Sequence, residues 1–164
     1  MQNQTVNFRE LLKQNSFTVD RPRSAPDCWL IGTLGNWAHE TLKTGADKIT
    51  FDLLEIEGHP GNDEGILEGV NLKNLRSPYA KNLTATYWAS AAYHLTNMLD
   101  RVIGDPERPM EERLPETKGL RVMFKVRRLE EDGKDTGQNE VDARTVALAA
   151  NPETETETEQ EAAE

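Results

Sequence analysis

Residues 120–127 read LRVMFKVR and carry the clearest strand pattern in the chain. Apolar positions alternate with three basic side chains and a methionine, which is the two-residue period of a half-buried β-strand. The apolar face consists of Leu120, Val122, Phe124 and Val126. Turn chemistry at Asp132-Gly133 and Thr136-Gly137 leads to residues 139–148 (NEVDARTVAL), which predict a returning strand. This part of the chain is therefore expected to form a β-hairpin.

Three segments upstream of this hairpin also have strand character. Residues 28–35 (CWLIGTLG) form a continuous apolar run that is interrupted by glycines. In residues 48–57 (KITFDLLEIE) the apolar face shifts by one position between Leu53 and Leu54, which predicts a β-bulge there. A weaker strand is predicted at about 65–72.

One segment has a strongly helical pattern. In residues 84–103 apolar side chains recur every three or four positions and form a wide stripe that includes Trp88. Gly104 followed by Asp105-Pro106 is a typical helix end. We therefore predict one long helix that interrupts the strands, with Trp88 in the core.

The two ends of the chain differ from the segment between them. Residues 1–27 are expected to form a short helix, capped by Asn7, and an extended connector that contains prolines. Residues 151–164 (NPETETETEQEAAE) have no large apolar side chain and are expected to form a disordered acidic tail. Residues 28–150 remain as the folded domain.

Five or so strands with one long helix between them predict a mainly β fold. The order of elements fits a small, partly open β-barrel on the plan of the OB-fold. The alternative is an α+β sandwich, in which the helix packs on an antiparallel sheet.

The composition excludes several classes of protein. The chain has 164 residues, enough for one domain with a core, and its single cysteine, Cys28, excludes a disulfide framework and a cysteine-based zinc cage. No stretch approaches the roughly 18–20 apolar residues of a membrane span, and the first residues lack the pattern of a signal peptide. We therefore expect a cytoplasmic protein without membrane contact.

The charge is unevenly distributed along the chain. The formal net charge is −10, and six of the glutamates lie in the last fourteen residues. Residues 1–150 contain 23 acidic and 19 basic residues, a net charge of −4. The acidic balance of the whole chain therefore does not exclude a nucleic-acid partner for the folded domain.

Basic and aromatic side chains supply a candidate nucleic-acid site. Cations two positions apart on a strand can follow a phosphate backbone, and exposed aromatic rings can stack on bases. The candidate cations are Arg121, Lys125 and Arg127 on the predicted strand and Lys73, Arg76 and Lys81 on a loop. The candidate stacking residues are Trp37, Tyr79 and Trp29. The alternative is a solvated strand face whose cations are balanced by acidic residues across the hairpin, among them Glu140.

Catalysis finds little support in the sequence. His39, His59 and His94 fit no strong metal template, although His59 lies in a loop with other possible ligands. The sequence has no glycine-rich phosphate loop and no serine nucleophile elbow. We expect a protein that is not an enzyme and that needs no metal or cofactor.

The acidic tail has a physical consequence if the domain carries a cationic groove. A tethered polyanion competes for such a groove at a high effective concentration, so it would weaken loose electrostatic binding. It can also recruit other proteins. The alternative is a tail that only increases solubility.

The chain resembles small bacteriophage proteins in the order of four segments, over about residues 5–148. These segments are NFRELLKQN, VDRPRSAPDCWLIGTL, LTATYWASAAYHLTNML and KGLRVMFKVRRLEEDGKDTGQNEV. The resemblance implies an OB-like fold and binding of single-stranded DNA in a replication or recombination module, in the cytoplasm of the host cell.

The chain is also similar, more distantly, to single-stranded-DNA-binding proteins with an acidic C-terminal tail. The tails of those proteins often end in an aromatic or apolar residue that docks on partners, whereas this chain ends Glu161-Ala162-Ala163-Glu164. Electrostatic shielding is therefore the expected role of the tail, ahead of recruitment of replication or recombination proteins.

Three functional hypotheses follow from these observations, and the last of them is an enzyme with a metal at the His59 loop. The first is a non-catalytic protein that binds single-stranded DNA with little sequence preference. The second is a phage structural or protein–protein interaction module, for which a discrete homo-oligomer or another protein partner is expected instead of oligonucleotide binding.

Overall fold

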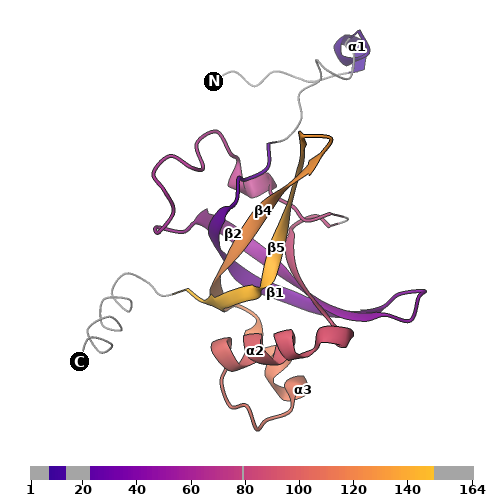
Figure 1. Cartoon of the computed structure of the whole chain (residues 1–164), viewed down its shortest axis with the longest axis vertical. Helices are drawn as coiled ribbons and strands as arrows, with labels where there is room; N and C mark the ends of the chain where they lie inside the picture. Colours follow the sequence, from indigo (N-terminus) through magenta and orange to yellow (C-terminus); the bar gives the residue numbers. More distant parts are fainter. Residues whose placement is uncertain (1–7, 14–22, 79, 150–164) are drawn as a thin grey trace.

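The computed structural model describes residues 8–13, 23–78 and 80–149 (Figure 1). The strands are β1 (Cys28–Thr41), β2 (Asp47–Gly58), β3 (Leu83–Trp88), β4 (Arg121–Glu131) and β5 (Lys134–Leu148). The α-helices are α1 (Phe8–Leu11), α2 (Tyr93–Val102) and α3 (Met110–Arg113). Short 3-10 helices span Leu72–Asn74, Ala89–Ala91 and Leu114–Thr117. The predicted mainly β fold is confirmed.

The five strands form one antiparallel sheet in the order β3-β2-β1-β4-β5. The sheet is twisted and curled, and α2 and α3 lie together at one end of it (Figure 1). None of the helices in the described part of the chain has the length and apolar character that a membrane crossing requires.

The predicted C-terminal hairpin is confirmed. Asp132 and Gly133 both have a positive φ, as a tight hairpin turn requires, and β5 returns along β4. The second predicted turn is wrong, because Gly137 lies inside β5 beside an irregularity in the pairing.

The bulge predicted near Leu53–Leu54 is present in β2. Ile31 of β1 pairs with Glu57 and Thr33 pairs with Leu54, so β2 contains one extra residue there, and Glu55 has a φ of 51°. Leu54 follows the inward Leu53 and is exposed on the outer face, and the extra residue brings Ile56 back against the core.

The prediction of one long helix over residues 84–103 is wrong. Residues 83–88 form β3, and the helix proper is the ten-residue α2. Leu83, Ala85 and Tyr87 point inward at every second position, and the intervening threonines are β-branched and favour a strand. The helical stripe included Trp88, which is an outward residue of β3, so pairing with β2 and not the stripe decided the outcome.

The weak strand predicted at about 65–72 is also wrong. This segment consists of turns that end in the 3-10 helix Leu72–Asn74. Its apolar side chains, Ile66, Leu67 and Val70, are half-buried against the core, so their role is packing and not pairing.

The core lies between the inner face of the curled sheet and α2. The largest completely buried side chains from the strands are Leu30, Leu34, Phe51, Leu53, Leu83, Val122, Phe124, Val126 and Val146. Helix α2 adds Leu95, Met98, Leu99 and Val102. Because every strand contributes to this core, the outward side chains of all strands have fixed positions.

Hydrogen bonds bring the two edge strands of the sheet toward each other. Tyr87 Oη of β3 donates to the carbonyl oxygen of Ala143 in β5 at 2.7 Å, and burial raises the pKa of this tyrosine. The backbone N–H of Asn139 in β5 donates to the carbonyl oxygen of Arg76, just before β3, at 2.9 Å. These bonds hold β3 close to β5.

Residues 23–27 pack on the β4–β5 hairpin. Ser24 and Ala25 are buried, and Asn139 binds both the N–H and the carbonyl oxygen of Ala25. Arg128 donates to the hydroxyl and the carbonyl oxygen of Ser24. The Asn7 cap, most of the connector and the acidic tail lie outside the described residues, as does Tyr79.

Candidate nucleic-acid interface

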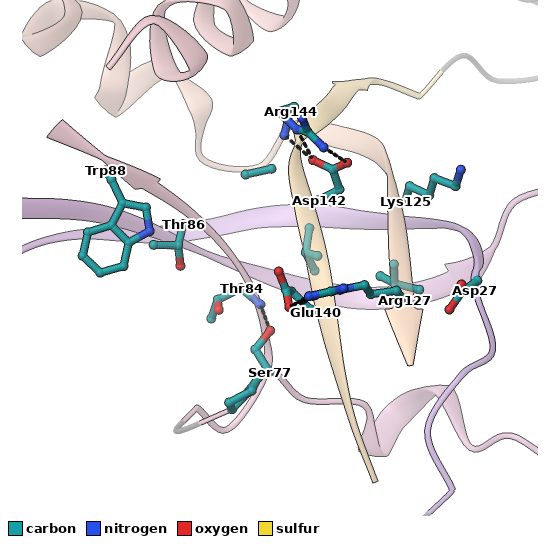
Figure 2. Close-up of a pocket in the computed structure, with 14 residues that line it drawn as sticks. Asp27, Ser77, Thr84, Thr86, Trp88, Lys125, Arg127, Glu140, Asp142 and Arg144 are labelled. Atoms are coloured by element: carbon teal, nitrogen blue, oxygen red, sulfur yellow. Dashed lines mark hydrogen bonds and ion pairs between the residues drawn. The ribbon is translucent and has the colours of Figure 1, made fainter. Parts of the chain in front are cut away.

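A groove of about 710 Å³ crosses the outer face of the sheet where β3 faces β5 (Figure 2). We call it the β3–β5 groove. Its polar and aromatic lining is Asp27, Ser77, Thr84, Thr86, Trp88, Lys125, Arg127, Glu140, Asp142 and Arg144. The strand residues in this set are those that alternate with the buried positions of β3, β4 and β5, so the pleat of each strand points them outward.

Positive and negative charges in the β3–β5 groove are balanced. Arg127 contacts Glu140 across the hairpin at 2.6 Å. Arg144 forms two hydrogen bonds with Asp142, at 3.0 and 3.1 Å, and these hold the pKa of Asp142 below its usual range. The remaining lining cation, Lys125, is exposed and forms no ion pair with any described residue. Lys125 is therefore the cation that a phosphate group can reach without displacing a carboxylate.

Trp88 supplies an aromatic surface at one end of the β3–β5 groove. Its side chain is 41% exposed, which contradicts the prediction that it belongs to the core. Lys48 Nζ lies 5.6 Å from the centroid of the Trp88 ring. Figure 2 shows Thr84 and Thr86 following Trp88 along the same strand, so hydroxyl groups lie between the ring and the basic residues of β4.

Lys125 and Arg127 lie together in the β3–β5 groove, but Arg121 does not. The Arg121 guanidinium donates to Thr33 Oγ1 at 3.0 Å and to the carbonyl oxygen of Glu55 at 2.7 Å, and it contacts Glu57 at 2.8 Å. Arg121 therefore stabilises the bulge of β2.

The three predicted loop cations lie outside the lining of the groove. Arg76 and Lys81 are exposed on the loop that also supplies Ser77 to the groove lining, and Lys73 is exposed in the preceding 3-10 helix. None of these three side chains lines the groove. Tyr79 is outside the described residues.

The predicted stacking residues Trp37 and Trp29 do not line the groove. Trp37 is 37% exposed in β1, where it pairs with Phe51, and it does not line the groove. Trp29 is half-buried and pairs with Lys125. Its backbone N–H and carbonyl oxygen are both bound by the side chain of Asn62, so the loop after β2 is held beside it.

The groove residues that sequence reasoning missed include Thr84, Thr86, Trp88 and Arg144. The period-two alternation of Leu83, Ala85 and Tyr87 is the signal that could have placed the first three on an outward strand face.

The described residues contain no cluster of three or more histidine, cysteine, aspartate or glutamate side chains that could hold a metal ion. Burial, together with the charge of Asp27, raises the pKa of the Cys28 thiol to about 11, so the thiol is protonated at neutral pH and a poor nucleophile.

No protein-family model matches the chain, and no curated protein matches it either.

Proposed function

We propose that this protein binds single-stranded DNA in the β3–β5 groove, without catalysis, and serves a phage replication or recombination module. The observation that carries the proposal is an exposed tryptophan, Trp88, at the end of a groove that also presents Lys125, Arg127 and Arg144. A stacking ring combined with basic side chains is the usual composition of single-strand binding surfaces.

The arrangement of the strands supports an OB-like plan for this proposal. The strand order β3-β2-β1-β4-β5, with α2 between β3 and β4 and with β3 facing β5, fits a five-stranded, partly open barrel. OB-folds bind oligonucleotides on the face of their second and third strands. Here that face presents Lys48 of β2 and Thr84, Thr86 and Trp88 of β3.

The ion pairs in the groove define how the DNA would bind. A phosphate can contact Lys125 directly, but it must compete with Glu140 for Arg127 and with Asp142 for Arg144. The electrostatic part of the binding free energy is therefore small, and stacking on Trp88 supplies a larger share. Such a surface tolerates different sequences, because every base has a face that can stack.

The first test is the salt dependence of binding to a labelled mixed-sequence oligonucleotide. With one to three phosphates neutralised, we expect the logarithm of the association constant to fall with the logarithm of salt concentration with a slope of roughly −0.7 to −2. Fluorescence anisotropy at several salt concentrations measures the slope. An absence of binding at about 50 mM salt, for the full chain and for a chain without residues 151–164, would refute the proposal.

Deletion of residues 151–164 is expected to tighten binding severalfold at low salt and to have no effect at high salt. The six glutamates of this segment compete with DNA for the basic side chains of the groove, and salt screens that competition. A matched control replaces these glutamates by glutamine and keeps the length. If that variant behaves like the wild type while the deletion does not, the charge of the tail is not the cause.

The balanced charges of the groove also favour a second candidate function, a phage structural or protein–protein interaction module. Surfaces on which paired charges alternate are suited to polypeptide partners as well as to a second copy of the chain. Sedimentation analysis separates the two candidates. A discrete oligomer together with an absence of oligonucleotide binding supports the interaction module.

A further inference from the structure

A second, smaller pocket of about 220 Å³ lies next to the β3–β5 groove. We call it the Ala92 pocket. It is formed where the β1–β2 hairpin faces the start of α2, and its buried or half-buried apolar lining includes Ile49, Tyr87, Ala92, Leu95 and Met110. Trp88 lines both the groove and the pocket. The two hollows are therefore neighbours that share one aromatic wall.

The polar side chains of the Ala92 pocket lie on its solvent side. His39 and Asp47 are 57% and 43% exposed, whereas Leu95 and Tyr87 are buried. His39 Nε2 lies 3.5 Å from Asp47 Oδ2, and the hydroxyl of Thr41 donates to Asp47 Oδ1 at 2.5 Å. The hydrogen bond from Thr41 holds the pKa of Asp47 below its usual range, so this carboxylate is an acceptor at neutral pH.

The size and lining of the pocket fit a flat ring with a polar edge. An apolar cavity of about 150 Å³ accepts a benzene ring, so 220 Å³ is sufficient for a nucleobase. The apolar walls suit the faces of the base, and Asp47 lies where a hydrogen-bonding edge would remain near solvent. Lys48 also lines the pocket, and its Nζ lies 3.6 Å from Glu40 Oε2, so the attached phosphate would compete with Glu40 for this cation.

We propose that the Ala92 pocket accepts one base of the bound strand and that Asp47 selects a base with an exocyclic amino group over thymine. This inference rests on the proposed function of the β3–β5 groove. Cytosine and adenine present amino donors, at N4 and N6, that a carboxylate can accept. Thymine presents one donor, N3–H, and it is flanked by the carbonyl oxygens O4 and O2, so a carboxylate that accepts from N3–H also lies close to two oxygens that repel it. The binding surface as a whole tolerates different DNA sequences, and only the base in the Ala92 pocket is selected by its chemical identity.

The experiment compares an all-thymine oligonucleotide with the same oligonucleotide carrying one central cytosine. A hydrogen bond to a charged group corresponds to about a tenfold difference in affinity, so we expect the cytosine-containing strand to bind about tenfold more tightly. Competition measured by fluorescence anisotropy gives this ratio directly.

Two variants and one control test whether Asp47 and the Ala92 pocket cause the preference for cytosine. Asp47→Asn is expected to reduce the ratio to near one, because an amide can donate to thymine as well as accept from cytosine. Ala92→Leu fills the pocket and is expected to have the same effect without changing Asp47. Asp63→Asn removes the same charge from an exposed loop position that lines neither hollow, and it should leave the ratio unchanged.

The possible outcomes separate this inference from the proposed function. Equal binding of both strands by the wild type overturns the base pocket and leaves DNA binding in the groove intact. A preference for cytosine that survives both Asp47→Asn and Ala92→Leu places the discrimination elsewhere and also overturns the inference. A change in oligomeric state caused by Ala92→Leu would assign the pocket to a second copy of the chain. An absence of binding to either strand refutes both proposals.

Discussion

Replacing Trp88 by alanine is expected to weaken binding of single-stranded DNA by about thirtyfold. Stacking of one base on an aromatic side chain contributes about 1–3 kcal/mol, and a loss of about 2 kcal/mol corresponds to this factor. The exposed Trp88 ring ends the β3–β5 groove and lies near Lys48, so a base on it would also be close to a cation. Trp88→Phe should recover part of the affinity, because it retains an aromatic face.

A matched control for this prediction is Trp37→Ala. Trp37 has nearly the same exposed fraction as Trp88, 37% against 41%, but it lies in β1 and lines neither the groove nor the Ala92 pocket. We expect Trp37→Ala to change the dissociation constant less than threefold, within the usual effect of a remote surface substitution. Both constants are measured by anisotropy titration at one salt concentration. Equal losses of DNA affinity in the two variants would show that the groove is not part of the DNA-binding surface.

Replacing Asn139 by alanine is expected to lower the free energy of unfolding by about 3 kcal/mol. The Asn139 side chain is completely buried. It accepts a hydrogen bond from the N–H of Ala25 at 2.9 Å and donates to the carbonyl oxygens of Ala25 and Arg127 at 2.8 and 3.0 Å. The substitution leaves these backbone groups without their partner, and the N–H of a buried residue is the costliest of them to leave unbonded.

Thermal or urea denaturation measures this loss. For a domain of this size a destabilisation of about 3 kcal/mol corresponds to a fall in melting temperature of roughly 6–12 °C. Asn97→Ala is the matched control, because Asn97 is exposed on α2, and its expected effect is below about 0.5 kcal/mol. An unchanged midpoint for Asn139→Ala would mean that residues 23–27 do not depend on this side chain for their position.

The β4–β5 hairpin was predictable because its pattern is local. Each apolar residue of β4 sits two positions from the next, and Asp132-Gly133 supplies the turn, so neighbouring residues alone define the element. The segment around β3 was not predictable in this way. A stripe of period 3.6 continues from Trp88, an outward residue of β3, into α2, so the pattern did not show where the strand ends and the helix begins.

The candidate site was predictable in part. Alternation on β4 correctly placed Lys125 and Arg127 on one outward face. The alternative interpretation, in which cations of this face are balanced across the hairpin, is confirmed for Arg127, which contacts Glu140. Arg121 points to the same face of β4, but its guanidinium binds the bulge of β2. The extra residue in β2 brings the Glu55 carbonyl oxygen and the Glu57 carboxylate within reach of this guanidinium.

The amino-acid sequence by itself determined which side chains of β4 point inward and where the apolar face of β2 shifts, because burial of one face of a strand is set by a period of two residues along the chain. Only the tertiary structure decided that β3 would face β5, and with it the position of the groove and of Trp88. That arrangement depends on contacts between residues more than fifty positions apart, such as Tyr87 and Ala143. Their pairing follows from the closure of the whole sheet around one core, and no local pattern encodes it.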